Sequence, residues 1–123
     1  TYAVNADQWQ RHDRFPAGDT VNLYLDDRFS LSLAAPTAKA AHDDYVSDPA
    51  HPVPFVPVPV NMRDRAMWGS WLVSDQRHAS TRPDVVTYVS QPLKAPLQIH
   101  GQPEANLFAS TSGTDSDWVV KLI

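Results

Sequence analysis

Apolar and polar residues alternate in short stretches along the chain, and this pattern predicts β-strands. In residues 21–27, Val21, Leu23 and Leu25 alternate with other positions, and residues 29–35 repeat the pattern. The Asp-Asp-Arg sequence between the two stretches is typical of a tight turn, so we expect a β-hairpin. Further stretches of strand character cover residues 84–90, 96–101, 104–110 and 117–123. Short strands separated by turn residues predict an all-β sandwich.

Residues 61–75 break this alternation and predict a short helix. Four large apolar residues have the spacing of one helix face: Met67, Trp68, Trp71 and Leu72. Asn61 can cap the start of the helix, whereas Gly69 disfavours it by about 1 kcal/mol relative to alanine. A second helical turn is expected within residues 6–16, ended by Pro16. The sequence therefore predicts one or two short helices beside the strands.

The proline segment, residues 45–60, contains five prolines in sixteen residues. Pro54 and Pro57 have the bare P-x-x-P spacing of a polyproline ligand, although no Lys or Arg in the segment would orient such a ligand. Proline lacks a backbone N–H, so the segment is not expected to form a central strand. Its valines and Phe55 make it too apolar for a solvated linker. We expect an extended crossing segment whose apolar side chains face a neighbouring surface.

Composition narrows the class of protein. A chain of 123 residues has the size of one domain. Its net charge is −4 and its basic residues are scattered, so we expect no nucleic-acid partner. No apolar run approaches the length of a membrane span, so we expect no membrane partner. Cysteine is absent, which excludes disulfides, thiolate metal sites and a cysteine nucleophile.

The sequence offers no catalytic, cofactor-binding or metal-ligating residue with a recognisable pattern. A G-x-S-x-G nucleophile turn is missing, and Ser70 lies on the predicted helix. The pairs Asp43–Asp44 and Asp115–Asp117 lack the spacing of a Ca²⁺ loop and fit turn chemistry better. We expect all five histidines to be exposed or hydrogen-bonded: His12, His42, His51, His78 and His100. No cofactor is predicted.

Three tryptophans leave a second function open. Trp9, Trp68 and Trp71 could form a ligand-stacking platform, as in a carbohydrate-binding β-sandwich module. Trp68 and Trp71 share a predicted helix face with other apolar residues, and such a stripe is more often core or interface.

Five stretches occur in the order found in one group of hydrolases: "DQWQRHDRFP", "YVSDPAHPVP", "WLVSDQR", "RPDVVTYVSQPL" and "ANLFASTSGTDSDWVVKLI". They resemble the C-terminal jelly-roll region of α-amino-acid ester hydrolases. That group includes the glutaryl-7-aminocephalosporanic acid acylases and belongs to a wider family with cocaine esterase and the X-Pro dipeptidyl-peptidases. The resemblance covers nearly the whole chain.

The resemblance implies one galactose-binding-like jelly-roll β-sandwich over residues 1–123, which is non-catalytic by itself. It implies an α/β-hydrolase domain in the same parent chain, which carries the catalytic triad outside this sequence. The parent's reaction would be acyl transfer from α-amino-acid esters or β-lactam amides. A periplasmic or secreted location is implied, and a homo-oligomer is left open.

An interface with this hydrolase domain is the main site that we predict. Its candidate residues are Pro52, Pro54, Phe55, Trp68 and Trp71. The apolar run at residues 118–123 also leads us to expect a piece cut from a longer protein, an incomplete jelly roll that is marginal or self-associated when isolated.

Overall fold

The computed structural model of the chain describes residues 1–3, 6–37, 41–56, 59, 61, 63–70 and 74–123. Two compact units are present. The first comprises residues 1–22 and 93–122, and the second comprises residues 23–92 with Ile123.

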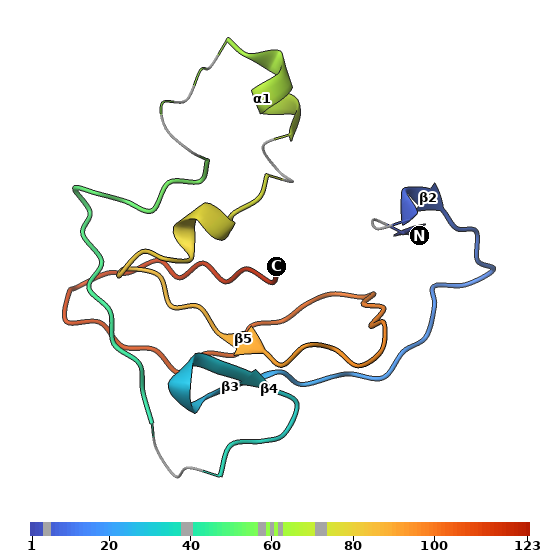
Figure 1. The fold of residues 1–123 in the computed structure, drawn as a ribbon, viewed down its shortest axis with the longest axis horizontal. Helices are drawn as coiled ribbons and strands as arrows, with labels where there is room; N and C mark the ends of the chain where they lie inside the picture. Colours follow the sequence, from blue (N-terminus) through green and yellow to red (C-terminus); the bar gives the residue numbers. More distant parts are fainter. Residues whose placement is uncertain (4–5, 38–40, 57–58, 60, 62, 71–73) are drawn as a thin grey trace. The chain divides into compact units, whose positions relative to one another are not determined.

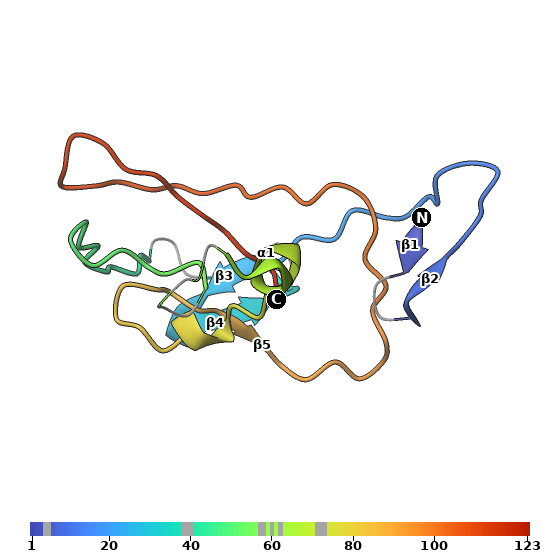
Figure 2. The same ribbon diagram turned by 90° about the horizontal axis from the view of Figure 1, so that it is seen from above.

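The first unit begins with a small β-hairpin (Figure 2). Strand β1, Tyr2–Ala3, pairs antiparallel with strand β2, Gln8–Trp9. Their aromatic rings lie opposite each other, with ring centroids 5.2 Å apart. Such cross-strand aromatic contacts stabilise an antiparallel pair. The helical turn predicted within residues 6–16 is therefore wrong for Gln8 and Trp9, which form a strand instead.

Three strand predictions in the C-terminal part of the chain are wrong. Residues 96–101 and 104–110 contain no strand, and neither do residues 117–123, although all of these residues are described. Alternation of apolar and polar residues shows which side chains would share one face of a strand. A strand also needs a partner strand to which its backbone is hydrogen-bonded. Gly101 has a φ of 111°, a conformation that side-chain-bearing residues rarely adopt. This glycine allows the chain to turn after residue 100.

The second unit contains a three-stranded sheet in the order β3-β4-β5 (Figure 1). Strands β3, Tyr24–Asp26, and β4, Ser30–Ser32, pair antiparallel, which confirms the predicted hairpin. Strand β5, Val89–Ser90, lies parallel to β4 on its other side. The strand predicted at residues 84–90 is thus present only at its end.

The turn of the β3–β4 hairpin is a 3₁₀ segment, η2, Asp27–Phe29. Arg28 and Phe29 both have positive φ, 55° and 57°, as in the type I′ turns that suit β-hairpins. This conformation is unfavourable for residues other than glycine, asparagine and aspartate. Phe29, predicted to begin the second strand, lies in the turn, where its ring contacts Tyr88 edge-on at 6.1 Å. That contact helps to offset the backbone cost.

The predicted helix is present as α1, Arg65–Ser70, with a different cap. The carboxylate of Asp64 accepts a hydrogen bond from the backbone N–H of Ala66 at 2.9 Å, which is N-cap geometry. Asn61 instead accepts from the N–H of Arg63 at 3.1 Å, in the turn before the helix. Among the described residues, no helix is both long and apolar enough to cross a membrane.

Candidate functional site

Residues 48–51 of the proline segment form a hydrogen-bonded turn. The Asp48 carboxylate accepts from the backbone N–H of Ala50 at 2.9 Å and from Nδ1 of His51 at 2.7 Å. The backbone N–H of His51 also donates to the Asp48 carbonyl at 2.9 Å. Pro49, the second residue of the turn, has the fixed φ that this position favours. The hydrogen bond from His51 lowers the pKa of Asp48, so the turn is strengthened by its carboxylate form.

Two side chains from later in the chain bind carbonyls of this segment. Nε2 of Gln76 donates to the Phe55 carbonyl at 2.7 Å. Nη2 of Arg82 donates to the His51 carbonyl at 3.0 Å. A third contact precedes the segment, where the Tyr88 hydroxyl donates to the Asp43 carboxylate. Side chains, rather than a backbone ladder, therefore connect residues 43–55 with residues 76–88.

The donors Gln76 and Arg82 are held by a series of tight turns. The 3₁₀ helix η4, Arg77–Ala79, follows Gln76, and the N–H of Arg82 donates to the Ala79 carbonyl at 3.1 Å. Ala79 is the one buried hydrophobic residue in the described part of the chain, with 7% of its surface exposed. The turns around the buried Ala79 therefore fix the backbone near Gln76 and Arg82.

Arg82 forms a bidentate ion pair with Asp84. Its Nε and Nη2 atoms donate to the two carboxylate oxygens at 2.7 and 2.6 Å. Only 10% of the Asp84 side chain is exposed, so water screens this pair less than it screens a surface pair. The hydrogen bonds from Arg82 are the main reason that the pKa of Asp84 is lowered. Asp84 therefore orients the guanidinium group that binds the proline segment.

Replacing Asp84 with asparagine is expected to reduce the dependence of stability on acid. A lowered carboxyl pKa in the folded state contributes stability above the ordinary carboxyl pKa of about 3.9, and this contribution is lost as the pH falls through the lowered pKa. Asp84→Asn should lower the urea unfolding midpoint near neutral pH and flatten its decline below about pH 4. The exposed carboxyl at Asp117 gives a control, Asp117→Asn. Parallel curves for the wild type and Asp84→Asn would contradict this role.

Tyr88 links the sheet to the start of the proline segment. It directly precedes strand β5, and its hydroxyl donates to Asp43. Burial, followed by the hydrogen bond to the Asp43 carboxylate, raises the pKa of Tyr88 to about 12. The hydroxyl is therefore protonated at neutral pH and remains a donor. Asp43, one of the possible calcium ligands in the sequence, accepts this hydrogen bond.

Three of the five predicted interface residues lie on the proline segment. Pro52 and Phe55 are exposed and Pro54 is half-buried. Val53 and Phe55 expose 44% and 42% of their surfaces, so two large apolar side chains are left accessible on a segment whose carbonyls are bound. The side chain of Trp68, on α1, and the whole of Trp71 lie outside the described residues, so the structure does not test them.

Of the three tryptophans in the alternative ligand-stacking platform, only Trp9 has a described side chain. Its side chain is 81% exposed on β2, and its ring is tilted by 55° to that of Tyr2, so these two rings do not form one flat face. Trp9 belongs to the first unit and Trp68 to the second. The carbohydrate-binding role stays a prediction.

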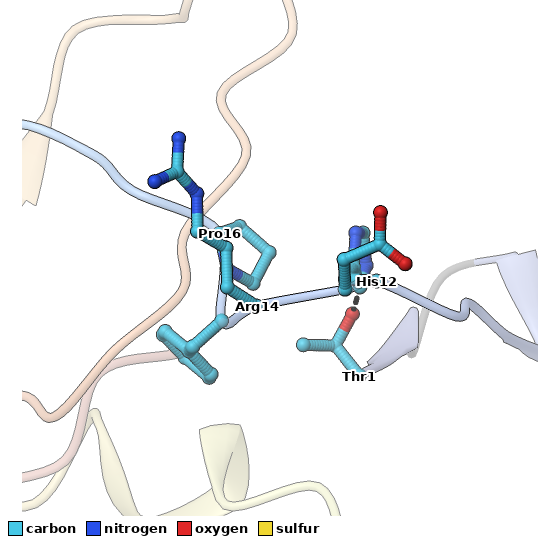
Figure 3. Close-up of a pocket in the computed structure, with 6 residues that line it drawn as sticks. Thr1, His12, Arg14 and Pro16 are labelled. Carbon is cyan, nitrogen blue, oxygen red and sulfur yellow. Dashed lines mark hydrogen bonds between the residues drawn. The ribbon is translucent and has the colours of Figure 1, made fainter.

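A shallow depression of about 330 Å³ lies in the first unit, at residues Thr1 and 12–16 (Figure 3). Figure 3 shows the Thr1 hydroxyl beside the His12 ring, and the two are hydrogen-bonded at 2.9 Å. The Arg14 side chain points away from this pair. The residues that line the depression are exposed, apart from the half-buried Pro16.

The other histidines have similar local partners, as predicted. His51 contacts Asp48, His78 contacts the Asp75 carbonyl and His42 pairs with Asp44. His100 packs edge-on against Phe15. Within the described part of the chain, no group of three or more His, Asp or Glu side chains could hold a metal ion.

Sequence reasoning missed Gln76 and Arg82, although both lie in the stretches that carried the resemblance. The available signal was the proline content of the segment. Proline removes backbone donors but leaves every carbonyl as an acceptor, so the carbonyls of such a segment are available to side-chain donors and to water. Long polar side chains in turns, such as Gln76 and Arg82, are the natural source of side-chain donors.

Similar proteins support the predicted resemblance. The cocaine esterase of Rhodococcus sp. (strain MB1 Bresler) is 29% identical over 133 residues, which cover 99% of this chain and 22% of that protein. A solved α-amino acid ester hydrolase, labelled with selenomethionine, is 47% identical with a TM-score of 0.63. That match covers 72% of this chain and 16% of the solved chain. The chain thus spans about a fifth of the length of these relatives.

The likeness to the solved ester hydrolase confirms the predicted all-β class and supports a jelly-roll sandwich with short helices. The model of one family matches residues 1–123, the full length of the sequence. It describes the non-catalytic domain at the C-terminus of X-Pro dipeptidyl-peptidases. This match confirms the prediction of a domain that is non-catalytic by itself. The chain belongs to the family of X-Pro dipeptidyl-peptidase C-terminal non-catalytic domains.

Proposed function

We propose that the chain is the accessory domain of a serine hydrolase or acylase that acts on α-amino-acid esters and β-lactam amides. It packs against the α/β-hydrolase domain of the same parent chain through the apolar face of the proline segment. The observation that carries this proposal is the exposure of Val53 and Phe55 on a segment that Gln76 and Arg82 hold in place. A fixed apolar surface loses little conformational freedom when it binds, which favours docking.

The contact surface of this proposed interface contains Pro52, Pro54 and Phe55. Proline has little conformational entropy to lose on binding, and Phe55 supplies a large apolar area. Trp68 and Trp71 remain candidates for the same interface from the sequence alone. From the family resemblance, we also propose a periplasmic or secreted location and a homo-oligomer.

The hydrolase domain would carry out the chemistry. Its serine attacks the carbonyl of the ester or amide, the alcohol or amine leaves, and water or a β-lactam amine then takes the acyl group. This sequence contains no G-x-S-x-G turn that would expose such a serine. The domain would therefore affect the reaction only indirectly. It would support the hydrolase domain and shape the edge of its active-site region.

The chain alone is expected to hydrolyse no α-amino-acid ester, because its sequence contains no G-x-S-x-G nucleophile turn. Turnover of the isolated chain and of its full-length parent should be compared under the same conditions. A fluorophosphonate probe, which labels activated serines, should label the parent outside residues 1–123. Turnover by the isolated chain, or labelling of a serine such as Ser70 within it, would overturn the proposal.

A further inference from the structure

We infer that Gln76 and Arg82 are positioning residues that hold the proline segment antiparallel to residues 76–88 through a ladder of side-chain hydrogen bonds. The ladder fixes the direction in which Phe55 faces a partner. The part of this inference that concerns docking rests on the proposed function, whereas the ladder stands on the contacts of the second unit alone.

The register follows from the order of the three contacts. Asp43 is bound by Tyr88, the His51 carbonyl by Arg82 and the Phe55 carbonyl by Gln76. As the chain advances from 43 to 55, its partners step back from 88 to 76. The two stretches therefore run in opposite directions, although residues 76–85 form consecutive turns rather than an extended strand. Helix α1, Arg65–Ser70, lies in the connection between them (Figure 1).

A backbone ladder is not available to this pair of stretches. Pro49, Pro52 and Pro54 have no N–H, so nearly half of the donors between residues 49 and 55 are missing. The remaining carbonyls still need donors. Side chains that reach across from the opposite stretch satisfy two of them, the carbonyls of His51 and Phe55.

Arg82 suits this role because its guanidinium group serves two acceptors at once. Nη2 contacts both the Asp84 carboxylate and the His51 carbonyl, while Nε makes the second bond to Asp84. The planar fork is therefore oriented before it binds the segment. Lysine at this position would keep the charge without the fork.

The chain contains a matched control for this contact. Arg77 also forms a bidentate ion pair two residues away, with Asp75, and this pair lowers the pKa of Asp75 to about 2. Its described side-chain hydrogen bonds all go to Asp75, none to the proline segment. Arg77→Met therefore removes a bidentate pair of the same spacing, with a more exposed carboxylate, and leaves the ladder intact.

The test measures amide hydrogen exchange in the full-length parent. Arg82→Met is expected to raise exchange of the Ala50 and His51 amides at least tenfold, because both amides are hydrogen-bonded within the Asp48 turn that Arg82 holds through the His51 carbonyl. Gln76→Met is expected to have a smaller effect, because it removes only the contact at the Phe55 carbonyl. Arg82→Lys should recover part of the protection and Arg77→Met should leave it unchanged. Exchange in the β3–β4 hairpin, which these variants do not touch, reports whether the second unit is still folded.

Each outcome decides the inference. A rise confined to residues 45–56 supports the ladder. A rise of the same size in the β3–β4 hairpin, or no difference between Arg82→Met and Arg77→Met, overturns it. Thermal unfolding of the same variants tests docking separately. If exchange rises in the segment and the parent still unfolds in its wild-type manner, the ladder stands and the proposed docking face is wrong.

Discussion

Phe55→Asp, introduced into the full-length parent, is expected to uncouple this domain from the hydrolase domain. Phe55 is the largest apolar side chain described in the proline segment, and 42% of its surface is exposed without the hydrolase domain. Fully burying such a side chain contributes about 1.5–3 kcal/mol, so burying the exposed 42% contributes about 0.6–1.3 kcal/mol. An aspartate at this place loses that contribution and adds the cost of a carboxylate without a partner. We therefore expect the free energy of docking to fall by about 2 kcal/mol, with the larger part due to the carboxylate.

Scanning calorimetry of the parent would measure this effect. The wild type should unfold in one coupled transition, and Phe55→Asp should give two, with the earlier one assigned to this domain. Phe55→Leu keeps an apolar side chain and should remain coupled. Gln91→Asp places a carboxylate on an exposed position outside the segment and should also remain coupled. A single transition for Phe55→Asp at the wild-type temperature would mean that the hydrolase domain does not cover Phe55.

The sequence predicted the parts of the fold that depend on neighbouring residues. The hairpin of β3 and β4 follows from alternation on both sides of an Asp-Asp-Arg turn, and both strands form. The turn lies one residue later than expected, because Phe29 enters the left-handed region and packs against Tyr88. Tyr88 is 59 positions away in the sequence, so no local pattern reveals the contact.

Predictions that needed a distant partner were less successful. Residues 104–110 alternate as a strand should, but no described strand pairs with them. The described residues 45–56 of the proline segment form no central strand, as predicted, but their partners Gln76 and Arg82 were not predicted. Their role depends on which carbonyls they reach, and this is set by the turns around Ala79 rather than by residue type.

The isolated chain is expected to associate with itself, and the hydrolase domain supplied in trans is expected to reverse this association. Many large apolar side chains are exposed in both units, among them Leu33, Val46, Val89, Phe108 and Val119. Monomeric proteins rarely expose contiguous apolar patches above about 600 Å². A micromolar dimer needs about 8 kcal/mol, and three to six buried side chains at about 1.5–3 kcal/mol each reach that range before the costs of association.

Sedimentation velocity over a wide range of protein concentration would measure this association, with the hydrolase domain added in a second series. Wild-type chain should shift from self-associated species to a one-to-one complex with the hydrolase domain. Phe55→Asp should still self-associate through the remaining apolar side chains but should form the complex poorly. This difference separates a specific docking face from general apolar exposure, since only the docking face depends on one side chain. A chain that stays monomeric at every concentration would show that its exposed apolar residues need no partner.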